Sequence, residues 1–534
     1  MDYSIPPTNF FHGVGALTSL KVLSISSCKF SGNLTGSGLC ELTHLEELVL
    51  NYNYLKGALP SCLANLTSLK RLSLDLNRFS GNITLSPLNK LTNLHYLSLS
   101  DNDFQIPISL QPFFNHSKLK IINAKNNKFY ADIAIESLEP SFQLNILALS
   151  GYGDCGAIPN FLYSQHDLKT LDLSHLNLTG EFPIWLLENN TRLNKLLLVN
   201  NSLSGPIELL AHSHRSLEHL DISKNFLDGH IPMEIGASLP RLRDLNISRN
   251  SLTGSIPPSV GDMKLLASLD LSHNNLSGGI PKKLTMGCLS LRLLILSNNN
   301  LQGQIFYGKF SLFLLDELQL NDNHFYGSIP KVLSNCSSLY LIDFSNNNLS
   351  GRIPSWMGQL SKIHVLNLSH NFLVGQIPST FSNLEQLESL DLSYNNLSGK
   401  IPPQLVQLHF LSTFRVAYNN LSGETPKRVG QFGTFDERCY EGNPLLCGEP
   451  MKSCGATSPP LIPESPTPGR EDDGFIDMGV FYVSLIVSYI MMLITIAAVL
   501  YINPYWRRAW FYYAEMCFIS SYYFIVDHLP KQFH

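Results

Sequence analysis

The stretch LESLDLSYNNLSGKIP (Leu387–Pro402) decides the fold of this chain because close copies of it lie on both sides. IHVLNLSHNFLVGQIP (Ile363–Pro378) precedes it, and LSTFRVAYNNLSGETP (Leu411–Pro426) follows it. The three copies follow the frame LxxLxLxxNxLxGxIP, from which the first departs at Ile363 and the last at Phe414, Val416 and Thr425. We call the asparagine position of this frame the Asn slot and follow it along the chain.

The Asn slot returns at a nearly constant interval and defines seventeen frames between residues 15 and 425. The first frame has Cys28 in the slot, and the sixth and seventh have Tyr152 and Leu176. The other frames have asparagine there, at Asn53, Asn77, Asn102, Asn127, Asn201, Asn225, Asn250, Asn274, Asn299, Asn323, Asn347, Asn371, Asn395 and Asn419. A period of about 20–29 residues with LxxLxL before an asparagine is typical of leucine-rich repeats.

Each letter of the frame has a physical role. The leucines of LxxLxL alternate along a short strand, so neighbouring frames must stack to bury them. The asparagine amide can bond backbone groups of its own turn and of the neighbouring turn. Glycine permits a tight turn, and Ile-Pro favours an extended return. We therefore predict a leucine-rich repeat solenoid, a curved right-handed α/β-type superhelix with a parallel concave β-sheet about 80 Å along its inner row.

Tyr152 and Leu176 interrupt the expected asparagine ladder, within LALSGYGDCGAIP and LDLSHLNLTGEFP. Irregular repeats are tolerated in such arrays, so a local irregularity is one interpretation. A bend or a partner-binding site near residues 150–180 is the other. Cys28 is a milder replacement because a thiol is small and still donates weakly.

Composition argues against several classes of function. The 534 residues carry a net charge of −5 and only 15% of them are charged, so no basic field indicates nucleic acid binding. The ten cysteines and seventeen histidines show no zinc-ligand spacing. No GxSxG, HExxH, P-loop or kinase motif occurs. We expect neither an enzyme nor a bound cofactor or metal.

Residues 478–502 read MGVFYVSLIVSYIMMLITIAAVLYI and contain no charge. A run of this length is enough for a transmembrane helix, which needs about 20 apolar residues. The charges that flank the run are Glu471, Asp472, Asp473 and Asp477 before it and Arg507 and Arg508 after it. The positive-inside rule therefore places the repeats outside the cell and the tail, residues 503–534, in the cytoplasm. Residues 509–526 are aromatic and apolar, and they either lie on the inner leaflet or form a second span.

LxGxIP and the end of the array resemble plant extracellular leucine-rich repeat proteins, in particular the receptor-like proteins that have a membrane span but no kinase. The most specific stretch is GQFGTFDERCYEGNPLLCGEPMKSC, which is followed by an acidic patch, the apolar run and NPYWRRAWFYYAE. The resemblance covers essentially the whole chain. It implies an extracellular sensor of peptides, microbial patterns or developmental signals that acts through membrane-bound receptor kinases as adaptor and co-receptor.

The repeats, the composition and the resemblance together divide the chain. We expect an irregular N-terminus (1–14), the repeats (15–425), a C-terminal cap (426–456) and a Pro/Ser-rich acidic linker (457–477) before the span. The resemblance implies a cap disulfide between Cys447 and Cys454, which leaves Cys439 as a free thiol. Family members also have a signal peptide, a paired-cysteine cap before the first repeat and an island before their last four repeats. This sequence shows none of these three, and we expect its native N-terminus to extend further.

Ligand binding should use the non-leucine positions of the strands, which face the concave surface. Aromatic residues and arginine are favoured at binding hot spots. The large or charged residues at such positions are Tyr52, His95, Tyr96, Lys120, His219, Arg243, Asp244 and Arg249. Toward the membrane, the resemblance implies a co-receptor contact, for which the candidates are His370, Tyr394, Arg415 and Tyr418.

NxS/T motifs predict N-glycosylation of an extracellular array. They begin at Asn33, Asn65, Asn82, Asn115, Asn177, Asn189, Asn200, Asn246, Asn275, Asn335, Asn348, Asn367, Asn396 and Asn420. Asn246 and Asn367 fall within predicted strands, where a glycan would stand on the concave face and block a ligand.

The sequence favours a single-pass receptor-like glycoprotein of the plasma membrane that acts in defence or development. A secreted-type inhibitor that binds cell-wall hydrolases is one alternative, and the uncharged run of residues 478–502 argues against it. A truncated decoy that binds without signalling is another, and the missing cap and island favour it. We expect the lipid bilayer, an extracellular ligand and receptor kinases as partners, and no nucleic acid.

Overall fold

The computed structural model describes residues 7–34, 38–132, 139–209 and 213–454. The chain divides into two units, Met1–Ala456 and Thr457–His534, and all described residues belong to the first. The predicted membrane span, its acidic linker and the cytoplasmic tail therefore lie outside the described residues. Within the four described ranges, no helix is both long enough and apolar enough to cross a membrane.

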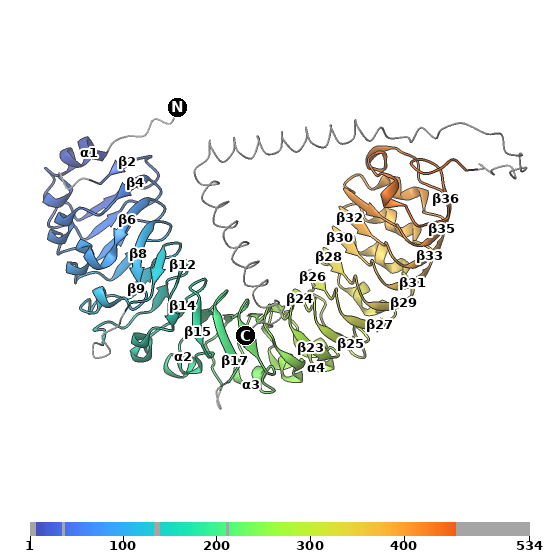
Figure 1. Cartoon of the computed structure of the whole chain (residues 1–534), viewed down its shortest axis with the longest axis horizontal. Coiled ribbons are helices and arrows are strands. Elements are labelled where there is room, and N and C mark those ends of the chain that lie inside the picture. The colour runs from blue at the N-terminus through green and yellow to red at the C-terminus, as the bar shows by residue number, and fades with distance from the viewer. Residues whose placement is uncertain (1–6, 35–37, 133–138, 210–212, 455–534) are drawn as a thin grey trace, which may run out of the picture. The chain divides into compact units, whose positions relative to one another are not determined.

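A parallel sheet of seventeen strands follows the described array, with one strand for each predicted frame (Figure 1). Every strand is short, and its middle residue is a buried leucine, isoleucine or phenylalanine. The predicted parallel-sheet solenoid is thereby confirmed. The strands are β1 (Val22–Ser24), β3 (Glu47–Val49), β5 (Arg71–Ser73), β7 (Tyr96–Ser98), β9 (Ile121–Asn123), β11 (Ile146–Ala148), β14 (Thr170–Asp172), β16 (Lys195–Leu197), β18 (His219–Asp221), β20 (Asp244–Asn246), β22 (Ser268–Asp270), β24 (Leu293–Ile295), β26 (Glu317–Gln319), β28 (Leu341–Asp343), β30 (Val365–Asn367), β32 (Ser389–Asp391) and β34 (Thr413–Arg415).

A second row of parallel strands forms just after the Asn slot, where the sequence predicted only a turn and an extended return. In the C-terminal part of the array, β24 to β32 of the first row lie on the inner side of the arc and the second row lies on the outer side (Figure 1). The second row has breaks between β12 and β13 and between β19 and β21. Its strands are β2 (Ser31–Asn33), β4 (Tyr54–Gly57), β6 (Arg78–Asn82), β8 (Asp103–Pro107), β10 (Lys128–Tyr130), β12 (Tyr152–Asp154), β13 (Gly156–Ala157), β15 (Leu178–Gly180), β17 (Ser202–Pro206), β19 (Phe226–Asp228), β21 (Thr253–Ser255), β23 (Asn275–Gly278), β25 (Asn300–Gly303), β27 (His324–Gly327), β29 (Asn348–Arg352), β31 (Phe372–Gly375), β33 (Asn396–Gly399), β35 (Asn420–Glu424) and β36 (Leu445–Cys447).

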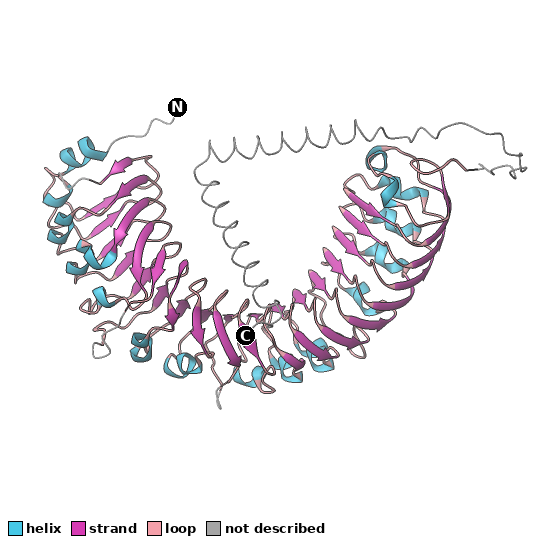
Figure 2. Ribbon diagram, in the orientation of Figure 1, coloured by secondary structure: helices cyan, strands magenta, loops and turns pink. Residues whose placement is uncertain are grey.

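Short helical turns connect the two rows, and most of them are 3₁₀ turns rather than the helices of an α/β-type superhelix (Figure 2). The turn η10 (Ser379–Asn383) shows why: it begins behind Pro378, and the buried Leu384 follows it directly. Proline suits the start of a helix, but about five residues leave no room for two α-helical turns.

The four α-helices in the described ranges are α1 (Pro7–Val14), α2 (Ile184–Asn189), α3 (Ile235–Ser238) and α4 (Lys282–Gly287). The 3₁₀ turns are η1 (Leu39–Glu41), η2 (Ser61–Asn65), η3 (Ile83–Leu85), η4 (Pro87–Lys90), η5 (Gln111–Phe113), η6 (Asn160–Ser164), η7 (Pro258–Asp262), η8 (Lys331–Asn335), η9 (Ser355–Gln359), η10, η11 (Pro403–Gln407), η12 (Gly430–Gly433) and η13 (Glu437–Cys439). The α/β-type part of the fold prediction is therefore wrong. The segments that connect the two rows, which we call the outer turns, are mainly 3₁₀ turns.

The asparagines form the predicted ladder between repeats. Asn347 is 6% exposed, and its Nδ2 donates to the Leu320 carbonyl of the preceding repeat at 3.0 Å. The same amide donates to Phe344 O at 3.2 Å and to Ser345 O at 3.0 Å. Its Oδ1 accepts a hydrogen bond from Phe325 N at 2.9 Å. One side chain thus ties two repeats together through four hydrogen bonds.

The ladder stops at the two frames that depart from the pattern. The Tyr152 side chain is 74% exposed, whereas Leu176 is fully buried in the core. The ladder also runs past residue 425, where the sequence analysis ends the repeats. Asn443 donates to Val416 O at 3.0 Å and to Tyr440 O at 2.8 Å. The cap therefore continues the repeat geometry for one further rung.

The N-terminal end of the array is closed by α1, and the expectation of an irregular residue range 1–14 is wrong for residues 7–14. Phe11 of this helix is fully buried, and its ring lies 6.3 Å from that of Phe30. Cys40 and Cys62 form a disulfide that the sequence analysis did not predict. They are 22 residues apart and occupy unequal positions in neighbouring frames, so the period does not reveal the pair.

The C-terminal cap contains the disulfide that the resemblance implied, which joins Cys447 to Cys454. Cys439 is a free thiol, as the resemblance also implied. Phe414 of the last sheet strand packs against Phe432 and Phe435, with ring centroids at 5.0 and 5.6 Å. These rings replace the next repeat and cover the end of the core.

A buried histidine makes the stability of the array depend on pH. His116 is fully buried, and its two ring nitrogens lie 3.1 Å from Phe113 O and from Leu88 O. Burial lowers the pKa of His116, although the two carbonyls oppose the shift. Below the ordinary histidine pKa, the unfolded chain therefore binds a proton at His116 more readily than the folded chain does. The free energy of unfolding consequently falls as the pH falls through this range.

We expect His116→Gln to reduce this loss of stability in acid. Gln165 holds the same position two repeats later and accepts a hydrogen bond there, so glutamine suits the site. Melting temperatures at about pH 7.5 and about pH 5 should differ less in the variant than in the original chain. His44→Gln, at an exposed histidine, is the control and should leave the difference unchanged. Equal differences in all three proteins would contradict the prediction.

Candidate ligand-binding face

The seventeen-stranded sheet has one face in the core and one open face, which we call the sheet face. Residues two, four and six positions before the Asn slot alternate with the buried leucines and point to the open side. In β32, for example, the buried Leu390 stands between two half-buried neighbours. The positions seven before and one before the slot form the two edges of this face. All twelve predicted binding residues lie on the sheet face or on these edges.

The first group of predicted residues lies at the start of β7 and β9: Tyr96 is the first residue of β7, and His95 and Lys120 directly precede the two strands. The guanidinium carbon of Arg71, in β5, is 4.2 Å from the centre of the Tyr96 ring, which is a cation–π contact. Lys120 donates from Nζ to Gln143 O at 3.0 Å, and His95 Nδ1 lies 2.9 Å from Asn93 O. Sequence reasoning missed Arg71. The strand register, which pairs it with Tyr96, is the signal that could have revealed it.

The second group lies on β18 and β20. His219 Nδ1 is 2.5 Å from Asp244 Oδ2, and Arg243 Nε donates to Glu218 Oε2 at 2.9 Å. Both pairs are partly exposed, so each contributes at most about 1 kcal/mol of stability. Five strand steps, about 24 Å, separate this group from Tyr96. The structure therefore does not bring the predicted ligand-binding residues together in a single site.

A left-handed backbone places one side chain per repeat at an edge of the sheet face. The residue before the Asn slot has φ between 49 and 64° wherever it is not glycine. Tyr52 and Arg249 belong to this column, as do His370, Tyr394 and Tyr418. The turn that positions each asparagine requires a left-handed residue directly before it. The regular spacing of the asparagine ladder therefore also sets the spacing of this column of side chains.

His370, Tyr394 and Tyr418 form one continuous aromatic stack. Their ring centroids are 4.1 and 4.4 Å apart, with interplanar angles of 12 and 16°. Tyr418 donates from its hydroxyl to Glu441 at 3.1 Å, and this bond raises the pKa of Tyr418. Arg415 is exposed next to the stack, with Nη1 3.8 Å from Asp391 Oδ2. The structure thus brings the four co-receptor candidates to one surface, to which it adds Glu441.

A hollow of about 400 Å³ opens on the sheet face at the irregular sixth frame. Lys125 and Asp172 form an ion pair of 2.6 Å in its lining, and the Asp172 side chain is 5% exposed. Gly151 replaces the side chain that other repeats place at this edge, and Tyr152 turns outward beside it. The sequence signal for this hollow was Gly151 followed by Tyr152 in the Asn slot. Sequence reasoning did not predict the ion pair between Lys125 and Asp172.

A cluster of polar side chains around one carboxylate lies nearer the C-terminal end of the sheet face. Glu317 of β26 is 9% exposed, and it accepts hydrogen bonds from Gln319 and from the Tyr340 hydroxyl. The hydrogen bond to Glu317 raises the pKa of Tyr340 to about 12. Tyr340 therefore stays protonated at neutral pH and acts as a hydrogen-bond donor. This group offers recognition of polar partners.

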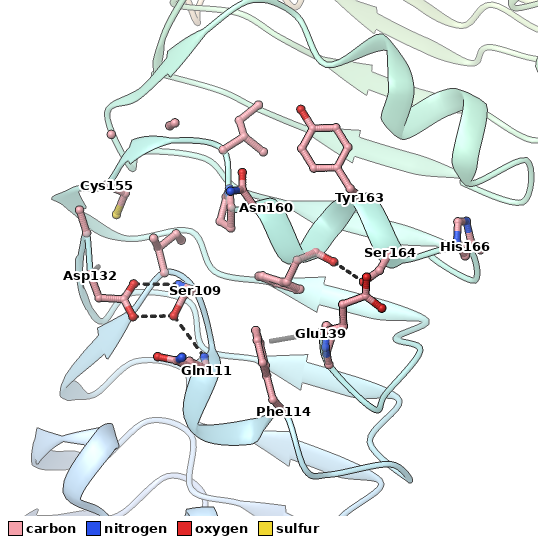
Figure 3. A pocket seen from close by; sticks show the side chains of 18 residues that line it. Ser109, Gln111, Phe114, Asp132, Glu139, Cys155, Asn160, Tyr163, Ser164 and His166 are labelled. Carbon is pink, nitrogen blue, oxygen red and sulfur yellow. Dashed lines mark hydrogen bonds between the residues drawn. The ribbon is translucent and has the colours of Figure 1, made fainter. Parts of the chain in front are cut away.

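Figure 3 shows a cavity of about 670 Å³ at the break between β12 and β13. Ser109 faces Asp132 and donates to Asp132 Oδ2 at 2.5 Å. Cys155 lies at the cavity wall, and burial raises the pKa of its thiol to about 12, so the thiol is not a nucleophile at neutral pH. Asp132 and Glu139, which border residues 133–138, both line the cavity.

The predicted glycosylation sites fall into two groups by exposure. The exposed ones are Asn33, Asn65, Asn115, Asn177, Asn200, Asn275, Asn335, Asn348, Asn396 and Asn420, and Asn82 and Asn189 are half-buried. Asn246 and Asn367 lie in β20 and β30, as predicted, and their Oδ1 atoms accept hydrogen bonds from the following serine hydroxyls at 2.7 and 2.8 Å. Their glycosylation stays a prediction.

Sequence comparisons identify the class. The family model "Leucine rich repeat" matches residues 215–276 and 361–421, and the model "Leucine Rich Repeat" matches residues 44–66 and 338–360. Cuscuta receptor 1 of Solanum lycopersicum is 32% identical over 176 residues, which are 33% of this chain and 16% of that protein. Receptor-like protein 14 of Arabidopsis thaliana is 46% identical over 145 residues, which are 27% of this chain and 15% of that protein. The chain thus spans about a sixth of the length of these curated relatives.

Solved structures agree with these matches. The crystal structure of PEPR1-AtPEP1 has a TM-score of 0.71 and 29% identity, and the match covers 83% of this chain and 64% of that one. The Arabidopsis receptor kinase HAESA, in complex with the peptide hormone IDA and the co-receptor SERK1, has a TM-score of 0.60 and 27% identity over 84% of this chain and 76% of that one. The described array has the leucine-rich repeat fold of these structures. Its relatives confirm the predicted resemblance to plant leucine-rich repeat receptor-like proteins.

Proposed function

We propose that this chain is a cell-surface receptor-like protein that binds a peptide, protein or pattern ligand on the sheet face and acts through membrane-bound receptor kinases. The observation that carries the proposal is the aromatic stack of His370, Tyr394 and Tyr418 beside the cap. It is separate from the aromatic and charged residues of the N-terminal strands. We therefore assign one surface of the array to a ligand and the other to a second protein.

The comparisons support this division of roles. The relatives are named as receptors or receptor-like proteins. The HAESA structure combines a fold of the same kind with both a peptide hormone and a co-receptor. The absence of kinase motifs from this sequence is the reason for assigning signalling to partner kinases. We propose no enzymatic activity for the chain itself.

The proposal places the repeats outside the plasma membrane. The uncharged residues 478–502 and their flanking charges support this topology. The test is to express the full chain in plant cells with a C-terminal tag. A product that loses mass on endoglycosidase treatment and whose repeats, but not its tag, are cut by external protease would support the proposal. An unglycosylated product that external protease does not reach would overturn it.

The aromatic stack gives a second test. Tyr394→Ala together with Tyr418→Ala should weaken the association of the full chain with its partner kinase about tenfold, because exposed aromatic residues that become buried at an interface are strong hot spots. Arg415→Ala should have a smaller effect in the same direction. Co-precipitation of the full chain with a panel of plant membrane receptor kinases measures this.

Tyr326→Ala is the matched control, since Tyr326 is a tyrosine that is 53% exposed but lies in β27 of the second row. This control should associate like the original chain. Association that survives the double substitution unchanged would remove the stack from the proposal.

A further inference from the structure

A row of cations, which we call the basic strip, follows the N-terminal half of the sheet face and the turns that directly precede its strands. It comprises the basic residues six, seven and nine positions before the Asn slot, from β5 to β16. They are Lys70, Arg71, Lys118, Lys120, Lys169, Arg192 and Lys195. The same positions in these repeats contain a single carboxylate, Asp167. The strip therefore has a strong excess of positive charge, although the chain as a whole is acidic.

Most cations of the strip have no carboxylate partner in the described part of the chain. Lys70 pairs with Glu46 at 2.5 Å. Lys118 and Lys120 donate to neutral oxygens, at 2.7 and 3.0 Å. The side chains of Lys169, Arg192 and Lys195 form no hydrogen bond or ion pair with any described residue. These charges are available to an anionic partner.

The C-terminal half of the sheet face differs in sign and in pairing. From β18 to β34, the same three positions hold four cations and five carboxylates. Arg243 pairs with Glu218, and Arg292 pairs with Asp316, both at 2.9 Å. Arg241 and Lys362 are isolated basic residues there, which makes them suitable controls. The excess of unpaired positive charge is therefore concentrated in the strip.

The spacing within the strip indicates the shape of its partner. Lys70, Lys120 and Lys169 occupy the same position in every second repeat, so they are about 9.6 Å apart along the sheet. A polyproline II segment repeats every three residues and rises about 9.3 Å in that interval. Lys70 already pairs with Glu46, so carboxylates at every third residue of such a segment would meet Lys120 and Lys169 in succession. A hollow of about 480 Å³ lies at the N-terminal end of the strip, and its lining includes Lys70 and Asn93 together with Glu46, the ion-pair partner of Lys70.

We propose that the basic strip binds an extended acidic peptide segment whose Asp or Glu residues recur about every third position. Charge complementarity supplies the orientation and much of the association rate. This inference rests on the proposed receptor function, because it specifies the chemistry of the ligand for the sheet face. It places that ligand on the N-terminal strands, away from the aromatic stack.

The probe for the test is a twelve-residue peptide, acetyl-(Glu-Pro-Pro)₄-amide with a fluorescent label, and the protein is the full chain at low ionic strength. We expect binding that weakens as salt is added. Lys120→Gln, Lys169→Gln and Lys195→Gln together should weaken it about tenfold, since three partly exposed ion pairs are lost. The control pair Arg241→Gln and Lys362→Gln should change binding less than about twofold. A peptide with glutamine in place of glutamate should not bind.

Two outcomes would overturn the inference. One is binding of the acidic peptide that the triple substitution leaves unchanged. The other is failure of the acidic peptide to bind, whether or not oligogalacturonate, an acidic polysaccharide, binds and depends on the same lysines. Neither result touches the proposed function, which the Tyr394 and Tyr418 variants test on a different surface. Circular dichroism of each variant checks that its repeats remain folded.

Discussion

Asn347→Ala is expected to destabilise the repeat array by about 3 kcal/mol, because it removes the hydrogen bonds of one buried amide and leaves one backbone N–H without an acceptor. The substitution removes the donor that reaches Leu320 O, Phe344 O and Ser345 O. It also leaves the Phe325 amide, which now donates to Asn347 Oδ1, without an acceptor. Alanine supplies no polar atom to replace either role.

Urea denaturation followed by circular dichroism measures this loss as a lower midpoint. Asn300→Ala is the matched control, because Asn300 is exposed and has one side-chain hydrogen bond, to His324. The control should change the free energy of unfolding by less than about 0.5 kcal/mol. If both variants unfolded at the same urea concentration, the ladder would not be the main polar link between repeats.

Gly287→Ala is the second large effect, and we expect it to cost about 2–3 kcal/mol through overpacking. Gly287 lies in α4, where an added Cβ would come well within 3.0 Å of the Gly261 carbonyl oxygen. A Cβ added to Gly261, in η7, would clash with Lys283 O. A Cβ added to Gly236, in α3, would clash with Ser259 O. The three outer turns therefore pack backbone against backbone, and none of them can move without disturbing the next.

Gly433→Ala separates this clash from the general effect of replacing a glycine. Gly433 lies in η12, and the nearest atom to its added Cβ is 3.6 Å away. The melting temperature should fall clearly for Gly287→Ala and stay within about 2 °C for Gly433→Ala. A Gly287 variant that melts like the original chain would show that the outer turns can spread apart at little cost.

The fold was largely predictable because the frame is local. The alternation of Leu387, Leu390 and Leu392 indicates a strand with one buried side, and the Asn slot indicates the turn that follows. Repetition then implies stacking, since no single repeat can bury its leucines. The second row of strands and the 3₁₀ outer turns were not predicted. They depend on how closely neighbouring repeats approach, and glycines such as Gly287 set that approach.

The candidate site was predictable only in part. Positions on the sheet face follow from the period, and the structure places all twelve predicted residues on this face or along its two edges. The period does not show which of these residues contact one another. His219 and Asp244 form a pair, whereas Tyr96 meets Arg71, which sequence reasoning passed over. Side-chain reach and rotamer decide such partnerships, and the period contains neither.

The sequence by itself determined the repeat, its parallel strands, its asparagine ladder and the two frames where that ladder fails, because each of these is specified within a single frame. Only the tertiary structure decided which side chains of different repeats come together. The stack of His370, Tyr394 and Tyr418, the Cys40–Cys62 disulfide and the unpaired lysines of the basic strip all belong to this second group. The physical reason is that such contacts depend on the offset and distance between neighbouring repeats, which the packing of the outer turns sets.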